Sequence, residues 1–162
     1  MAIIVTTNDG FDQDYYLAAK AAQLNALPGQ TQVWTPASVL QAFQAAGLTA
    51  SQHYSLYGYN EGLAPNAYYN NAQYVASKAA QAGMDPAAFE VAWYTASGST
   101  NMYTHYMQYG AFETGVNPSD GFNDQAYYEA KALQMGGGAT WETARDAIQS
   151  AGLNAISHYL LY

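Results

Sequence analysis

A single motif occurs three times along the chain and constrains its fold more than any other feature. It reads His-Tyr-x-x-Tyr, and it contains every histidine of the protein: His53, His105 and His158. The copies begin 52 and 53 residues apart. A regular spacing of this length is typical of an architecture built from repeated units. The motif therefore tells us more about architecture than about chemistry.

Helix signals fall at corresponding positions around each copy. Thr35-Pro36 and Asp85-Pro86 each place a capping side chain before a proline, and Thr140 provides the cap in the third copy. Asp12 is the expected cap of the first helix. The short helix that carries the motif is expected to start at Thr49 or Ser51 in the first copy and at Ser99 or Thr100 in the second. Gly58 and Gly110 follow the motif, and we expect the left-handed conformation that ends a helix.

These signals predict an all-α fold of three repeats of about 53 residues, each with roughly three helices. We expect the repeats at residues 10–66, 67–119 and 120–162, after an N-terminal arm at 1–9. They would pack as a compact or solenoid-like helical array. The third repeat is incomplete by comparison with the others, so we expect one structural domain of a longer protein.

The charge balance restricts the class of partner. Only 10% of the residues are charged, the net charge is −8, and four residues are basic against 16 tyrosines. Binding to nucleic acid or to an anionic membrane needs clustered basic side chains, so neither is expected. Metal cations and neutral glycans fit this balance better. There is no cysteine, and no apolar stretch long enough to span a bilayer, so we expect no membrane insertion.

The spacing of these features resembles a helical repeat of large bacterial exoproteins. The resemblance rests on the His-Tyr-x-x-Tyr-Gly motif and on Glu61-Gly62-x-x-Pro65-Asn66, and it extends from Gly10 to Tyr162. Such proteins include S-layer-like and calcium-binding RTX-type proteins that leave the cell by type I secretion. The resemblance implies an extracellular location at the bacterial cell surface, export without an N-terminal signal, and calcium as a cofactor. The glycine- and aspartate-rich nonapeptide calcium repeats of RTX proteins are absent from this sequence.

Acidic side chains gather at two places and are candidate calcium ligands, because calcium prefers six to eight oxygens. They are Asp9, Asp12, Asp14, Asp120 and Asp124. Helix capping is the alternative role. Glu61 and Glu113, in glycine-rich loops, could likewise bind calcium or accept hydrogen bonds from backbone N–H groups of the next helix.

Three further sets of residues recur with the repeats, and each has a binding and a structural interpretation. The histidines could form a metal or glycan site, or each could make one packing contact inside its own repeat. The lysines could face an acidic sugar or form salt bridges. The tryptophans could stack on sugar rings or belong to the core. The lysines and tryptophans are Lys20, Lys78, Lys131, Trp34, Trp93 and Trp141.

No catalytic motif occurs in the sequence, so we expect no enzyme. The predicted function is a structural and interaction module of a bacterial S-layer-like surface protein. It would assemble with copies of itself or anchor to surface polysaccharide, with calcium as an expected cofactor. The alternative is an adhesion or targeting appendage of a secreted enzyme or toxin.

Overall fold

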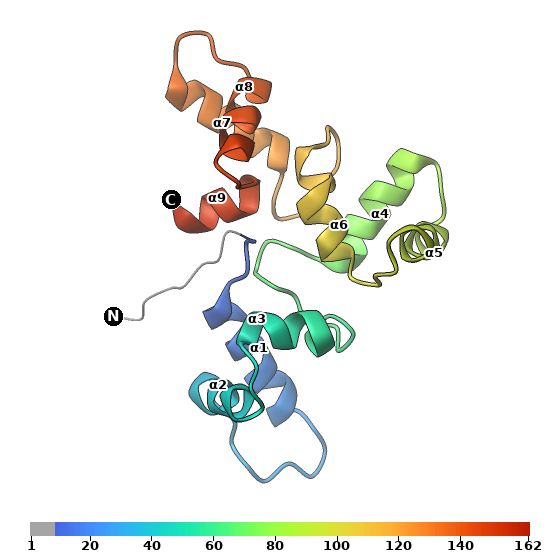
Figure 1. Cartoon of the computed structure of the whole chain (residues 1–162), viewed down its shortest axis with the longest axis vertical. Helices are drawn as coiled ribbons and strands as arrows, with labels where there is room; N and C mark the ends of the chain where they lie inside the picture. The colour runs from blue at the N-terminus through green and yellow to red at the C-terminus, as the bar shows by residue number, and fades with distance from the viewer. Residues whose placement is uncertain (1–8) are drawn as a thin grey trace. The chain divides into compact units, whose positions relative to one another are not determined.

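The computed structural model describes residues 9–162, and their secondary structure is helical (Figure 1). This part of the chain contains nine α-helices, one π-helical turn and one 3-10 turn, without a strand. The predicted all-α class is confirmed. The predicted arm at residues 1–9 lies outside the described residues except for Asp9.

The described chain divides into two compact units. The first is Phe11–Ala67, and the second is Tyr68–Tyr162 together with Asp9 and Gly10. The first unit therefore contains the first sequence repeat, and the second unit contains the second and third. That the chain forms one structural domain stays a prediction.

In the first unit, three helical segments surround a small aromatic core. They are α1 (Gln13–Asn25), α2 (Pro36–Ala45) and α3 (Ala50–His53), which runs directly into the π-helical turn η1 (Tyr54–Gly58). Helix α1 packs against both α2 and α3. The rings of Phe11 and Tyr54 lie 5.3 Å and 5.7 Å from the buried ring of Tyr16. Aromatic pairs at this separation add to the free energy gained by burying the rings.

The second unit contains the remaining helices. They are α4 (Asn71–Ala82), α5 (Pro86–Ser97), α6 (Met102–Gln108), the 3-10 turn η2 (Gly110–Phe112), α7 (Asp124–Met135), α8 (Trp141–Ser150) and α9 (Ala155–Leu161). Helix α4 packs against α5 and α6, and α7 packs against α8 and α9. The largest fully buried side chains of this unit include Tyr74, Tyr106 and Tyr128.

The helices begin close to where the sequence predicts. Asp12, Thr35, Asp85 and Thr140 each accept a hydrogen bond from a backbone N–H of the following first turn, and Thr49 does the same for α3. One predicted start is wrong, because α6 is capped by Asn101 rather than by Ser99 or Thr100. The Ser99 hydroxyl instead accepts a hydrogen bond from the Asn101 backbone N–H.

Gly58 and Gly110 do not adopt the left-handed conformation that the sequence predicts. The glycines with positive φ lie a few residues further on, at Gly62 and Gly115. Both glycines instead belong to helical turns, because Gly58 completes η1 and Gly110 starts η2. These two glycines therefore need another explanation, and the site geometry below provides it.

Candidate functional site

Each histidine of the motif is hydrogen-bonded to a tyrosine from the first helix of its own sequence repeat. The Oη to Nδ1 distances are 2.7 Å for Tyr16–His53, 2.6 Å for Tyr74–His105 and 2.6 Å for Tyr127–His158. The tyrosines come from α1, α4 and α7, and the histidines from α3, α6 and α9. We call these contacts the Tyr–His pairs. Of the two alternatives for the histidines, this geometry matches the packing contact inside each repeat.

The electrostatics of the Tyr–His pairs favour neutral partners. The pKa of each histidine is lowered from its ordinary value, first because burial penalises the charged imidazolium. Burial raises the pKa of Tyr127 to about 12, and it raises the pKa values of Tyr16 and Tyr74 further. Both partners are therefore neutral near pH 7, and we expect the phenol to donate to an unprotonated Nδ1, because a phenol O–H is a stronger donor than an imidazole N–H. Such a tyrosine is a poor proton donor near neutral pH, which favours a structural role for the pair.

Aromatic rings flank the first two histidines, and the third differs. Phe43 of α2 stacks on His53 with ring centroids 3.9 Å apart, and Trp93 of α5 meets His105 edge-on at 4.7 Å. Ile148 of α8 occupies the corresponding position in the third sequence repeat. It lines a pocket together with His158. The α8 side of this pocket is therefore aliphatic, whereas the ring of Tyr162 lies 5.0 Å from the imidazole.

Gly58 and Gly110 lie directly against the tyrosine of the pair. A Cβ atom on Gly110 would stand 2.7 Å from Tyr74 Cε2 and still closer to the phenol oxygen. On Gly58 it would stand 2.9 Å from Tyr16 Cζ and again closer to the oxygen. Real Cβ atoms do not approach so closely, so the glycine of the motif is explained by the space that the tyrosine hydroxyl needs.

Two of the three lysines form partly buried ion pairs. Lys20 Nζ lies 2.8 Å from Glu61 Oε2, and Lys78 Nζ lies 2.5 Å from Glu113 Oε2. The side chains of both lysines are 10% exposed and those of both glutamates 34%. Of the predicted alternatives for the lysines, the salt bridge matches these two positions. The glutamates have a partner that neither sequence interpretation named, a lysine from the first helix of the repeat.

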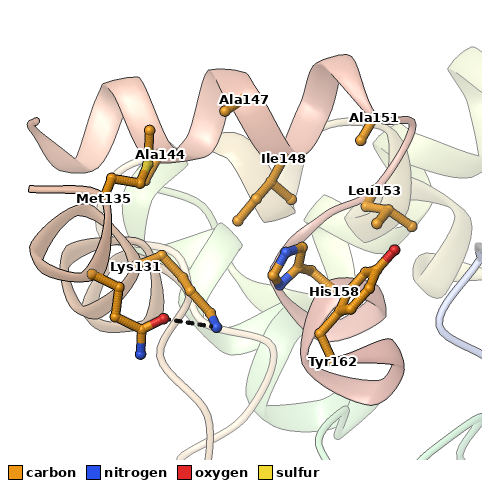
Figure 2. A pocket seen from close by; sticks show the side chains of 10 residues that line it. Lys131, Met135, Ala144, Ala147, Ile148, Ala151, Leu153, His158 and Tyr162 are labelled. Carbon is orange, nitrogen blue, oxygen red and sulfur yellow. Dashed lines mark hydrogen bonds between the residues drawn. The ribbon is translucent and has the colours of Figure 1, made fainter.

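Lys131 keeps only part of this arrangement. Its Nζ donates to Gln134 Oε1 at 3.2 Å and lies 5.5 Å from the centre of the Tyr127 ring. Within residues 9–162 it has no ion pair. It lines an open pocket of about 490 Å³ with His158, Ile148 and Tyr162, and Figure 2 shows these side chains around one space.

The candidate calcium ligands do not converge within the described residues. Asp12 caps α1, Asp14 lies exposed in the first turn of that helix, and Asp120 accepts from Gln73 Nε2 at 2.6 Å. The backbone carbonyl of Asp9 accepts from the Tyr103 hydroxyl. Across residues 9–162 no group of three His, Asp or Glu side chains is arranged to hold a metal ion.

The three tryptophans are half-buried and lie in different surroundings. Trp93 contacts the imidazole of His105, as described above. The Trp141 ring lies 5.1 Å from the Arg145 guanidinium and packs beside the core of α7, α8 and α9. The backbone of Trp34 is held by both atoms of the Asn25 amide. The interpretation of these rings as a shared sugar-binding surface stays a prediction.

A buried hydrogen-bond network that sequence reasoning missed joins the second and third sequence repeats inside the second unit. Tyr106 of α6 donates to Asp124 Oδ1 at 2.9 Å, and Tyr128 of α7 donates to the Ala111 carbonyl at 3.0 Å. Asp124 is 1% exposed, and its Oδ2 has no hydrogen-bond partner. Burial raises the pKa of Asp124 well above its ordinary value, although the bond from Tyr106 opposes this. Neither sequence interpretation of Asp124, as a calcium ligand or as a helix cap, includes this burial.

We expect Tyr74→Phe to destabilise the chain by about 1–3 kcal/mol, because it leaves the Nδ1 atom of His105 without a donor in a buried place. Tyr109→Phe is the matched control, since its side chain is 52% exposed, and it should change the free energy of unfolding by no more than about 0.5 kcal/mol. Urea denaturation measures both. Equal effects of the two substitutions would contradict a stabilising role for the Tyr–His pair.

We expect Asp124→Asn to flatten the pH dependence of stability. Folding raises the pKa of this carboxyl. Such a group stabilises the folded state fully at a pH below its pKa in the unfolded chain, and this contribution is lost as the pH rises toward its pKa in the folded chain. Between pH 5.0 and 6.5 the free energy of unfolding of the variant should therefore rise relative to that of the natural chain, by at most about 1.4 kcal/mol per pH unit. Comparing the two chains cancels the titration of the histidines. A difference that does not change with pH would show that Asp124 is ionised in the folded chain.

Comparisons of the chain with protein-family models, with curated proteins and with solved structures find no match. Within the described residues, no helix has both the length and the apolar character that crossing a membrane requires.

Proposed function

We propose that the chain is a structural and interaction module of a bacterial cell-surface protein of the S-layer-like kind. It would work by associating with copies of itself or with surface polysaccharide, and it would catalyse no reaction. The three sequence repeats would be units of one helical array. The extracellular location, type I secretion, polysaccharide and calcium rest on the resemblance of the repeat to bacterial exoproteins.

The observation that carries the proposal is the exposure of helix α5. Apart from Glu90, Thr95 and Ser97, the residues of this helix are apolar or aromatic. None of its side chains is buried. Phe89 and Trp93 are half-buried, whereas Val91 is 64% and Tyr94 54% exposed. Val91 and Tyr94 lie three residues apart and therefore on one face of the helix. An apolar helical face of this kind is typical of an interaction surface.

The bonding of the recurring polar side chains within the units supports the same proposal. Inside the units, the histidines are hydrogen-bonded to tyrosines, and two of the lysines form ion pairs with two of the glutamates. The large hydrophobic side chains that are exposed in residues 9–162 include several tyrosines, among them Tyr57, Tyr109 and Tyr159. Tyrosine combines an apolar ring with a polar tip and suits both protein and glycan partners.

Sedimentation velocity on the whole chain, with and without calcium, tests self-association. We expect concentration-dependent association that the double substitution Val91→Glu and Tyr94→Glu abolishes. Val33→Glu is the matched control, because Val33 is equally an exposed valine, at 79%, outside α5. A pull-down with bacterial cell-wall polysaccharide tests the second mode. A chain that stays monomeric and binds no polysaccharide would contradict the proposal.

A further inference from the structure

The pocket around Lys131 has a counterpart in each of the other two sequence repeats, and there it is closed by a glutamate-bearing loop. In the first repeat, Lys20 Nζ lies between Gln23 Oε1, at 2.9 Å, and Glu61 Oε2, at 2.8 Å. In the second, Lys78 Nζ has the same two kinds of partner, Gln81 and Glu113. We call the lysine and the glutamine three residues after it, together with the histidine of the motif, the framework. In these two sites the framework binds a loop that carries a glutamate.

The glutamine of the framework recognises the backbone of that loop as well. Gln23 Nε2 donates to the Glu61 carbonyl at 3.0 Å, and Gln81 Nε2 donates to the Thr114 carbonyl at 3.2 Å. One side of the site thus pairs with a carboxylate and the other with a peptide carbonyl. This combination fits a peptide segment better than an isolated small anion.

The third site has the same framework without such a loop among the described residues. Lys131, Gln134 and His158 occupy the corresponding positions of the third sequence repeat, and Lys131 Nζ donates to Gln134 Oε1. Figure 2 shows the side chains of Lys131 and His158 around the pocket. The remaining wall is apolar, from Ala144, Ile148 and other aliphatic side chains. The volume of about 490 Å³ is far larger than a carboxylate group, so it also has room for the backbone of a loop.

We propose that this pocket binds a glutamate side chain presented on a glycine-flanked peptide loop, with Lys131 pairing with the carboxylate and Gln134 with a loop carbonyl. The chemistry is the same whether the loop belongs to this polypeptide or to another molecule. The proposal goes beyond the surface function above and does not depend on it, because the pocket lies on α7, α8 and α9 rather than on α5.

A peptide titration tests the proposal. The probe is the loop that closes the first site, Gly58–Asn66, and the control is the same peptide with Glu61→Gln. Binding to the whole chain is followed by NMR shifts of the His158 imidazole and the Lys131 side chain. We expect saturable binding of the glutamate peptide, at least tenfold weaker binding of the glutamine peptide, and a similar loss in Lys131→Met. Because Lys131 has no ion pair within residues 9–162, this variant should keep its fold, which circular dichroism checks.

Two further arms complete the test. Dissociation of a self-associated chain by excess peptide would identify the loop of a second copy as the source, and binding to a chain that is already monomeric would identify another source. Repeating the titration in Val91→Glu, Tyr94→Glu separates this proposal from the proposed self-association through α5. No saturable binding, equal affinity for the two peptides, or acetate binding as tightly as the glutamate peptide would overturn the proposal.

Discussion

Gly110→Ala is expected to destabilise the second unit by about 3 kcal/mol, the largest effect that we predict for a single substitution. The new Cβ atom would stand 2.7 Å from Tyr74 Cε2 and closer to the phenol oxygen. Either the tyrosine moves and its bond to His105 is lost, or the turn η2 moves away from α4. Overpacking alone costs about 1–3 kcal/mol, and loss of the buried hydrogen bond adds to it.

The chain contains a matched control for this substitution. Gly121 also lacks a positive φ, and its added Cβ would stand 3.8 Å from Ser119 Oγ, an ordinary van der Waals distance. Gly121→Ala should therefore change the free energy of unfolding by less than about 0.5 kcal/mol. Thermal or urea unfolding measures the free energy of unfolding of both variants. If Gly110→Ala were as stable as Gly121→Ala, the close approach of Tyr74 would not explain the glycine of the motif.

Glu113→Gln is expected to cost about 2–3 kcal/mol, the second largest effect. It leaves the ammonium group of Lys78, whose side chain is 10% exposed, without a negative partner. Removing one partner of a fully buried pair costs about 3–5 kcal/mol, and we expect less here because the glutamate is 34% exposed. Lys78→Met should have an effect of the same sign, and the double variant should cost less than the sum of the two.

Lys131→Met and Glu90→Gln are the controls for this ion pair. Lys131 has no ion pair within residues 9–162, and Glu90 is exposed on α5. Each should change the free energy of unfolding by no more than about 0.5 kcal/mol. Additive effects of Glu113→Gln and Lys78→Met would show that the two charges do not interact.

Much of the local structure follows from the sequence because it depends on neighbouring residues. The caps at Thr35 and Asp85 act within one helical turn, and the proline that follows each cap favours the same helix start. The spacing of Tyr74 and Lys78 on one helix, matched by Tyr16 and Lys20, marks two positions that face the same side. That regularity places the tyrosines and the lysines at equivalent positions of the repeats, but it does not indicate that the tyrosines bond to the histidines.

The partners of those residues could not be predicted, because they depend on contacts between segments far apart in the chain. Glu61 lies 41 residues from Lys20, and no local pattern joins them. Gly110 was expected to have a positive φ because most glycines at helix ends do; its real constraint is a tyrosine ring from another helix. The burial of Asp124 likewise depends on a residue distant in the chain, since Tyr106 of α6, which bonds to it, lies 18 residues away.

The central claim is that the His-Tyr-x-x-Tyr motif holds helices together and has no chemistry of its own. Nitrogen-15 NMR of the three imidazoles during a pH titration tests it most directly. We predict that at pH 7.5 all three carry the proton on Nε2 and have an unprotonated Nδ1 that accepts from tyrosine, and that each titrates below the ordinary histidine pKa of about 6.5. An imidazole with its proton on Nδ1, or three imidazoles that shift together when a metal ion is added, would contradict the account.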